Sequence, residues 1–458
     1  MRKRNVLATF VTAEQSLRGR VTRKKASVTR TALAAGAAFA TMLGALLVSG
    51  AGPAGAASSS PADQGVTAKT INVGIPYVDF AALKSLGVNL DDGSFPDAYG
   101  AIIANINAQG GVNGRKLVPY FVEMNPAVPA SQTSSCTQLT EDDKVFVAIA
   151  PVFPDCYQQT YDTPVLFGSL PGTLPASAAP DFSLVPPNAA FDPIQLAAFN
   201  KEGVFKGKKV AIFYGASSDA PEVKTVQSDL KKLGVNVVDT ALDSVQATDA
   251  VASDQEVQSI AQRFQSDGVK VVVGVGGSGS TTWPRALLDN QSTYKPVYIA
   301  TDESALLSYV ESAKGNPYLD NLLTATANPS NYQAWKDPAI QKCAAVVRKA
   351  YPSDTISAPV DPTSPQAAAN STDTTYVSVE EACQYMALFT KIADAAGKNL
   401  TVASFSKAGY GLRNVTFPGS GGAVSFGPNQ PYAIGPAQVQ VYDPTSQQLV
   451  SQSSSTTK

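Results

Sequence analysis

The feature that most constrains the fold is an alternation, repeated twice, of short apolar runs and amphipathic segments. The first series begins with INVGI at residues 71–75, and the second begins with KVAIFY at residues 209–214. Short apolar runs bounded by turn residues indicate buried strands, and the longer segments between them have the periodicity of helices. Two successive β-α-β-α-β series therefore predict an α/β fold with two parallel sheets, each covered by helices on both faces.

The two series give a set of predicted elements. In the first series we expect strands at 71–75, 116–123, 145–150 and 164–168, and helices at 96–108, 131–142 and near Tyr157. In the second series we expect strands at 209–214, 235–239, 269–275 and 296–300, and helices at 194–201, 221–233, 254–266 and 283–289. Residues 183–192 are expected to cross between the series. Beyond them we expect helices at 338–351 and 377–396, an exposed loop at 352–375 and a final strand at 432–442.

The segment NINAQGGVNGRKL at residues 105–117 predicts how the first helix returns to the sheet. Gly110 and Gly111 tolerate the positive φ that ends a helix. Asn113 and Gly114 suit a tight turn, because both residue types accept left-handed backbone conformations. The segment is therefore predicted to lay residues 116–123 beside residues 71–75.

The first 57 residues have the composition of a targeting segment. They contain nine Lys and Arg and one acid, followed by an apolar stretch at 32–48 and the small residues Ala54, Gly55 and Ala56. This pattern predicts a signal peptide at 1–57, a linker at 58–65 and an exported chain, with a membrane anchor as the alternative. Removing residues 1–57 leaves 26 Lys and Arg against 36 Asp and Glu, so nucleic acid is not an expected partner.

The absence of histidine and the presence of four cysteines limit the chemistry of any site. A chain without histidine has no Ser-His-Asp or Cys-His nucleophile and no His-ligated metal site. Because no paired acids or metal cluster stands out either, we expect no enzymatic activity, no cofactor and no metal. An even number of cysteines in an exported chain suggests disulfides, and the local pairing of Cys136 with Cys156 and Cys343 with Cys383 is favoured among three connectivities. Buried free thiols are the alternative.

The pattern N-x-x-G-G-V-N-G-R-K-L, one helix after the first strand, resembles the signature of type I periplasmic binding proteins. These are the solute receptors of ABC transporters for leucine, isoleucine and valine. The resemblance extends to the element order, the break near Pro186 and Pro187, and the cysteines at 136 and 156. It implies two Rossmann-like lobes joined by a three-segment hinge: residues 66–187 with 329–437, and residues 188–328 with 438–458.

The same resemblance implies a function. The receptor would be a monomer that closes on a small-molecule ligand, an amino acid or a related solute, and delivers it to ABC permease subunits. A receptor of the same fold that feeds a signalling partner is one alternative, and an exported enzyme is another.

Eight residues that follow strands are the predicted ligand contacts, because open α/β sheets bind ligands beyond the carboxyl ends of their strands. They are Tyr77, Phe153, Ser169, Thr173, Gly276, Gly277, Ser278 and Asp302. The resemblance implies that Asp302 pairs with a ligand ammonium group, with a helix cap as the alternative, and that Ser169 and Thr173 donate to a carboxylate or carbonyl. The loop PVFPDC at 151–156 has no hydroxyl group, so Phe153 is expected to pack on an apolar or aromatic ligand.

The run GVGGSG at residues 274–279 matches the G-x-G-x-x-G pattern of dinucleotide-binding proteins. It follows the third strand of the second series, whereas the dinucleotide pattern belongs after the first strand of its unit. We therefore expect Gly276, Gly277 and Ser278 to approach the ligand with their backbone and expect no nucleotide.

Overall fold

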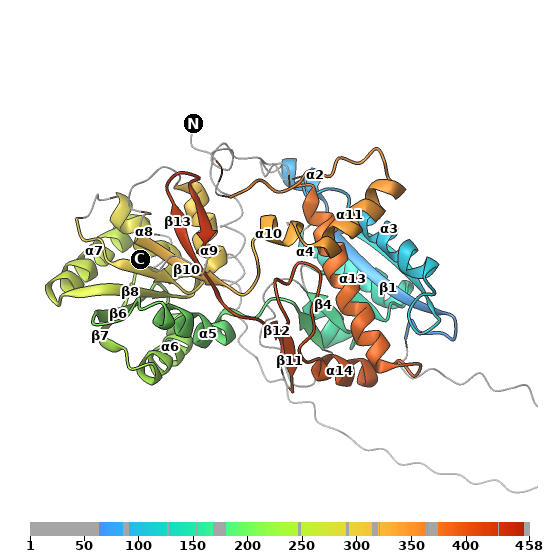
Figure 1. Cartoon of the computed structure of the whole chain (residues 1–458), viewed down its shortest axis with the longest axis horizontal. Coiled ribbons are helices and arrows are strands. Elements are labelled where there is room, and N and C mark those ends of the chain that lie inside the picture. The colour runs from blue at the N-terminus through green and yellow to red at the C-terminus, as the bar shows by residue number, and fades with distance from the viewer. Residues whose placement is uncertain are drawn as a thin grey trace, which may run out of the picture.

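The computed structural model describes residues 64–85, 91–125, 128–151, 154–167, 180–245, 249–289, 293–313, 319, 321–362, 364, 374–428 and 430–452. The predicted signal segment at 1–57 lies outside the described residues. Figure 1 shows two lobes side by side. Each lobe is built on a sheet of seven strands. No helix among the residues listed above has both the length and the apolar character needed to span a bilayer.

Lobe 1 is the lobe whose sheet has the strand order β11-β12-β5-β4-β3-β1-β2. Its strands are β1 (Thr70–Val78), β2 (Lys116–Met124), β3 (Val147–Ile149), β4 (Val165–Phe167), β5 (Asp181–Ser183), β11 (Ser425–Gly427) and β12 (Gln430–Ile434). Its helices are α2 (Phe80–Ser85), α3 (Phe95–Ala108), α4 (Pro129–Thr137), α10 (Asn331–Trp335), α11 (Pro338–Ala350), α13 (Tyr376–Ala396) and α14 (Val402–Gly411). Two π-helical turns, η2 (Gln138–Asp142) and η3 (Cys156–Thr160), complete it.

Lobe 2 is the lobe whose sheet has the strand order β14-β13-β10-β9-β8-β6-β7. Its strands are β6 (Lys209–Tyr214), β7 (Asn236–Leu242), β8 (Val269–Val275), β9 (Val297–Ala300), β10 (Leu322–Thr326), β13 (Gln438–Asp443) and β14 (Gln448–Ser451). Its helices are α5 (Asn188–Lys201), α6 (Ala220–Lys232), α7 (Ala250–Ser266), α8 (Gly276–Asp289) and α9 (Glu303–Ser312).

The two sheets share a parallel core with the same order. In lobe 1 the core is β2-β1-β3-β4-β5, and in lobe 2 it is β7-β6-β8-β9-β10, with every neighbouring pair parallel. β12 continues the parallel core of lobe 1, whereas β13 pairs antiparallel with both β10 and β14 in lobe 2. The predicted fold class, two mainly parallel sheets with helices in two lobes, is therefore confirmed.

Apolar residues of the strands alternate between the two faces of each sheet. In lobe 2, Val210 and Ile212 pack with α5 and α6, while Ala211 and Phe213 pack with α7 and α8 on the other face. All four side chains are fully buried. Such two-sided burial is what the continuous apolar run of β6 predicts for a central parallel strand.

Within the described residues the chain passes between the lobes three times, at 184–187, 327–330 and 435–437. These segments leave the carboxyl ends of β5, β10 and β12 and enter the other lobe. The carboxyl edge of each sheet therefore faces the opposite lobe. This arrangement follows from connectivity and strand direction alone.

The disulfides have the predicted local pairing. Cys136 in α4 is bonded to Cys156 in η3, and Cys343 in α11 is bonded to Cys383 in α13. The predicted turn after α3 is also present: Gly111 has φ of 71°, and a Cβ there would lie 2.0 Å from the carbonyl oxygen of Arg115. Only glycine fits so close to the backbone of the returning chain.

Three predicted helix boundaries are wrong. The helix predicted at 194–201 begins at Asn188, because α5 accommodates Pro193 in its interior, so the crossing is shorter than residues 183–192. The helix predicted at 283–289 begins at Gly276, because contacts with neighbouring strands outweigh the weak helix propensity of glycine. The helix predicted at 254–266 begins at Ala250, where the Asp249 side chain caps it. The segment predicted at 131–142 is helical to its end, as α4 followed by the π-helical turn η2.

The final strand predicted at 432–442 is in fact two strands in different lobes. β12 ends at Ile434, β13 begins at Gln438, and Gly435 and Pro436 lie between them. Proline has no amide hydrogen to donate to a β-ladder, so pairing does not continue through this segment. The apolar pattern continues on both sides of the break, which is why it predicted one strand.

Candidate functional site

The strand order places the candidate site at the carboxyl edges of the two sheets. In each parallel core the strand order reverses at the first strand: the second strand lies on one side of it and the third on the other. The switch point therefore lies between β1 and β3 in lobe 1 and between β6 and β8 in lobe 2. Ligands of open α/β proteins bind at such a switch point, beyond the carboxyl ends of the strands. Tyr77 lies at the end of β1, and Gly276 follows β8 directly.

Gly276, Gly277 and Ser278 form the first turn of α8 at the switch point of lobe 2. Gly276 has φ of 71°, and its amide donates to the Thr301 hydroxyl over 3.0 Å. A Cβ at Gly276 would lie 2.8 Å from Asp219 Oδ2, and a Cβ at Gly277 would lie 3.3 Å from Asp302 Oδ2. The glycines therefore let two carboxyl groups lie directly against the backbone of this turn.

Asp302 caps a helix, which is the role that the sequence offered as the alternative to a ligand contact. Its Oδ1 accepts a hydrogen bond of 2.9 Å from the Ala305 amide at the start of α9. Its own amide donates to the Ser280 hydroxyl over 3.1 Å. The cap uses one carboxyl oxygen, and the other faces Gly277, so capping does not prevent a ligand contact.

Two further acids lie beside Asp302. Burial, and then the Asp302 charge, raise the pKa of Asp219, while burial and the Asp219 and Asp302 charges raise the pKa of Glu222. Glu222 Oε1 also lies 3.4 Å from the Thr301 hydroxyl, which donates to it. Within the described ranges, no Lys or Arg forms an ion pair with these three acids.

A buried polar network lies behind the three acids. Asp192 and Gln195 of α5 are both fully buried, and Gln195 Nε2 donates to Asp192 Oδ1 over 2.9 Å and to the Thr301 carbonyl over 3.0 Å. Burial and the neighbouring Glu222 charge raise the pKa of Asp192 to about 8. The network ties α5, which begins at the first crossing, to the carboxyl end of β9.

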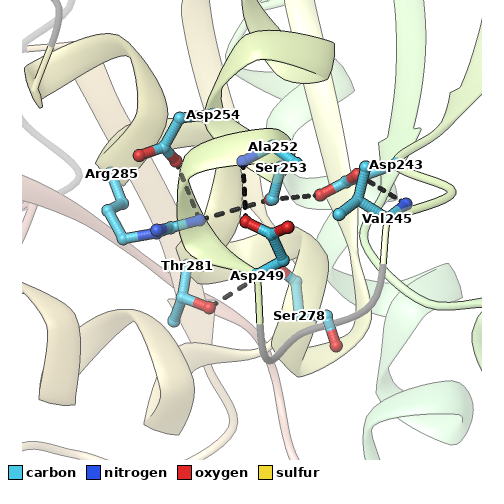
Figure 2. Close-up of polar contacts among 9 residues, drawn as sticks. All are labelled: Asp243, Val245, Asp249, Ala252, Ser253, Asp254, Ser278, Thr281 and Arg285. Atoms are coloured by element: carbon cyan, nitrogen blue, oxygen red, sulfur yellow. Dashed lines mark hydrogen bonds and ion pairs between the residues drawn. The ribbon is translucent and has the colours of Figure 1, made fainter.

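A second polar network connects α7, α8 and the residue that follows β7 (Figure 2). Arg285 Nη2 lies 2.9 Å from Asp254 Oδ1 and donates to the Ser253 hydroxyl over 3.3 Å. The Ser253 hydroxyl donates in turn to Asp243 Oδ2 over 2.5 Å, and Asp243 directly follows β7. This chain of contacts fixes the orientation of α8, whose first turn forms the candidate site.

Only part of the carboxyl edge of lobe 1 lies within the described residues. Tyr77 is half-buried and packs against the core of lobe 1. Burial, and then the charges of Glu123 and Asp79, raise its pKa. Phe153, Ser169 and Thr173 lie outside the described residues.

The structure brings Gly276, Gly277, Ser278 and Asp302 together, whereas Tyr77 lies on the other lobe. Asp192, Asp219 and Glu222 were not predicted from the sequence as site residues. Asp219 could have been predicted, because it lies at the end of the short loop that follows the first strand of lobe 2. The part of the chain that the structure describes contains no group of three His, Cys, Asp or Glu side chains suited to a metal ion.

Comparison with known proteins identifies the fold. No protein-family model matches the chain, and no curated protein matches its sequence. An ABC transporter substrate-binding protein from Desulfitobacterium hafniense, solved with Leu, aligns with a TM-score of 0.54 at 15% identity, over 84% of this chain and 100% of that chain. A putative branched-chain amino acid ABC transporter protein from Rhodospirillum rubrum gives a TM-score of 0.53 at 14% identity, over 84% and 100%.

A periplasmic binding protein type 1 from Bordetella pertussis gives a TM-score of 0.50 at 14% identity, over 84% of this chain and 99% of that chain. These alignments span both lobes. The chain therefore has the two-lobe fold of type I periplasmic binding proteins, as the sequence resemblance implied.

Proposed function

We propose that this chain is an extracytoplasmic solute-binding protein that encloses a small molecule between its lobes and delivers it to the permease subunits of an ABC transporter. The observation that supports this most directly is that both carboxyl edges face the opposite lobe, with three crossings as the connection. Movement about a few crossing segments closes two such lobes on a ligand. The solute remains chemically unchanged, so we assign no catalytic role.

The proposed ligand contacts come from both lobes. Lobe 2 supplies Gly276, Gly277, Ser278 and Asp302, with the acids beside Asp302 favouring a positively charged group on the ligand. Lobe 1 supplies Tyr77 and, from loops outside the described residues, Phe153, Ser169 and Thr173. A charge-assisted hydrogen bond to Asp302 would orient the ligand strongly.

The division of the chain follows the crossings. We propose that lobe 1 comprises residues 66–187 and 329–437 and that lobe 2 comprises residues 188–328 and 438–458. We further propose that residues 1–57 direct export and that the protein acts as a monomer. The two disulfides agree with an extracytoplasmic location.

A thermal-shift screen of the purified chain against a library of small metabolites tests the proposal. A ligand that binds only the folded state at about 100 times its Kd stabilises the protein by about 2.7 kcal/mol, so a true ligand raises the Tm with concentration. Small-angle scattering with that ligand should show a smaller radius of gyration. Catalytic turnover of the ligand, or the absence of any shift and any compaction across the library, would refute the proposal.

A pair of glycine variants locates the site. Gly277→Leu places a side chain against Asp302 and should abolish the ligand-induced shift. Gly411→Leu is the matched control, because a Cβ at Gly411 meets no atom within 4 Å, and it should keep the shift. Equal responses of the two variants would place the ligand elsewhere.

A further inference from the structure

The amino edge of lobe 2, where its parallel strands begin, carries an excess of positive charge. Three links between helices and strands lead into the neighbouring strands β6, β7 and β8, at residues 199–209, 229–239 and 263–270. Together they contain eight Lys and Arg and four Asp and Glu, and the fourth link, at 286–297, adds one residue of each sign. The amino edge therefore has nine of the 26 Lys and Arg that follow residue 57 but only five of the 36 acids.

The equivalent links of lobe 1 show that this excess is not a general property of the fold. They lead into β1, β2, β3 and β4, at residues 64–70, 105–116, 138–147 and 157–165. They contain four Lys and Arg and four Asp and Glu. The same topology is thus neutral in one lobe and positive in the other, so the charge comes from the sequence of lobe 2.

Five lysines of the three links are open to an external partner, and we call them the basic tip: Lys201, Lys206, Lys208, Lys231 and Lys270. Among the described residues none of them forms an ion pair, and all are exposed except the half-buried Lys208. The other three cations of these links have partners inside the lobe, two in ion pairs and one on a backbone carbonyl. A Cβ at Gly207, Gly234 or Gly268 would meet no atom within 4 Å, so the surface between the lysines is open.

The helix dipole explains only part of the basic tip. Lys201 and Lys231 lie in the last turns of α5 and α6, where a cation offsets the negative end of the dipole. Lys206 and Lys208 lie in the loop before β6, and Lys270 is the second residue of β8. No helix end requires these three lysines, so their positions need another explanation.

The three links lie close enough together for their charges to act jointly. β6 lies between β7 and β8, and Lys209 at its start pairs in register with Asn236 and Val269. Adjacent strands are about 4.8 Å apart, so the starts of β7 and β8 are separated by about 10 Å. This separation is close to the Debye length of about 8 Å at physiological salt, and the fields of the lysines therefore add at an approaching surface.

The composition of the basic tip fits a diffuse anionic surface better than a protein or a nucleic acid. Lysine is a flexible point charge, whereas arginine is favoured where a carboxylate or phosphate is recognised in a fixed geometry. Protein interfaces are depleted in lysine and enriched in aromatic residues, and single-stranded nucleic acids stack on aromatic side chains. The aromatic residues of the three links are all buried: Phe199, Phe205 and Phe264.

We propose that the basic tip binds the surface of a bilayer that contains anionic phospholipids, with its ammonium groups on the headgroup phosphates. This inference goes beyond the proposed function and does not depend on the identity of the solute. The first turn of α8 lies at the other end of β8, about 20 Å from the tip for strands of six or seven residues. Membrane binding would therefore leave the candidate ligand site accessible and would concentrate the receptor near its permease.

Amine footprinting of the full chain tests the proposal at single lysines. The chain is acetylated briefly with and without vesicles of phosphatidylglycerol and phosphatidylcholine, and each lysine is analysed by mass spectrometry. Lys206, Lys208 and Lys270 should lose reactivity on anionic vesicles, whereas Lys69 and Lys116 at the amino edge of lobe 1 should keep it. Vesicles of phosphatidylcholine alone should protect none of the five. Protection confined to residues 1–57, or equal protection of both lobes, would overturn the proposal.

Paired substitutions measure the contribution of the basic tip. Lys206→Gln combined with Lys270→Gln should lower the partition coefficient onto anionic vesicles about thirtyfold, because each lysine near such a surface contributes about fivefold. The matched control combines Lys69→Gln with Lys116→Gln, which removes the same charge from exposed positions of lobe 1. It should change the partition by less than about twofold, since these charges lie beyond a Debye length from the tip. An equal loss in both variants would assign the attraction to net charge and overturn the proposal.

Salt and a competing polyanion identify the source of the attraction. Binding to anionic vesicles should weaken between about 0.15 M and about 1 M NaCl, because salt screens the charges; binding that ignores salt would contradict the proposal. Binding of polyaspartate without binding of vesicles would assign the tip to an acidic polymer instead of a membrane. Vesicle binding by a chain that shows no solute-induced thermal shift would refute the solute-binding function alone and leave this inference standing.

Discussion

Lobe 1 and lobe 2 have the same order of parallel strands, but they are cross-linked in different ways. Both disulfides lie in lobe 1, where they join α4 to η3 and α11 to α13. The ion pairs between described residues all lie in lobe 2: Lys232–Asp229, Arg263–Asp239 and Arg285–Asp254. One lobe is thus restrained covalently and the other electrostatically.

The two kinds of cross-link respond to different conditions. A disulfide acts mainly by restricting the unfolded chain and is insensitive to salt, whereas an ion pair acts in the folded state and is screened by salt. Each lobe also contains one of the two tryptophans, with Trp335 in the core of lobe 1 and Trp283 in the core of lobe 2. Fluorine NMR of protein labelled with 5-fluorotryptophan can therefore follow each lobe without mutation.

The largest difference should follow from removing the Cys343–Cys383 disulfide, which closes a separation of 40 residues. Replacing both cysteines by alanine should lower the free energy of unfolding of lobe 1 by about 4 kcal/mol. The Trp335 signal should then report unfolding at a lower denaturant concentration than the Trp283 signal. Equal displacement of both signals would show that the lobes unfold as one unit and would break the comparison.

A smaller effect is expected in lobe 2 from Arg285→Met. The side chains of Arg285 and Asp254 are 31% and 16% exposed, so their pair is partly shielded from water. Loss of this pair should lower the free energy of unfolding of lobe 2 by about 1–2 kcal/mol, less than the loss of a fully buried pair. The unfolding transition reported by Trp283 should move to a lower denaturant concentration. Arg263→Met is the control, because Arg263 and Asp239 are 51% and 24% exposed and their pair should contribute less than about 1 kcal/mol. A larger effect from Arg263 would contradict the burial argument.

The smallest effect is a pH dependence centred on Asp181 in β5 of lobe 1. This side chain is 1% exposed, and burial raises its pKa to about 7. The folded state therefore holds the proton more tightly than the unfolded state, and stability falls as pH rises through about 7. Between pH 6 and pH 8 the loss should be about 1 kcal/mol. Asp181→Asn should remove this part of the pH dependence of the Trp335 unfolding profile, while Glu380 and Glu381, whose pKa burial also raises to about 7, supply the remainder. An unchanged slope would remove Asp181 as a cause.

The long buried strands were predictable from the sequence because their apolar runs leave no alternative. β6 and β8 have the predicted bounds 209–214 and 269–275. β5 was not predicted, because it contains three residues and begins with an acid. A strand this short is defined by its pairing with β4, which is a tertiary contact that a local pattern does not encode.

The candidate site was predictable only where it follows a strand. Asp302 and the run from Gly276 to Ser278 were identified from the ends of β9 and β8, and the structure places Gly277 beside Asp302. Asp192 and Glu222 belong to helices that come near this edge only after the sheet has formed. Their positions within amphipathic helices gave no indication of their burial beside other acids.

Because the backbone passes between the lobes three times, neither sheet can be finished early during synthesis. Lobe 1 requires β12, which ends at Ile434, and lobe 2 requires β14, which ends at Ser451. A ribosome must therefore release nearly the whole polypeptide before either hydrophobic core is sealed. A premature stop after residue 437 would leave lobe 1 whole and remove both antiparallel strands from lobe 2.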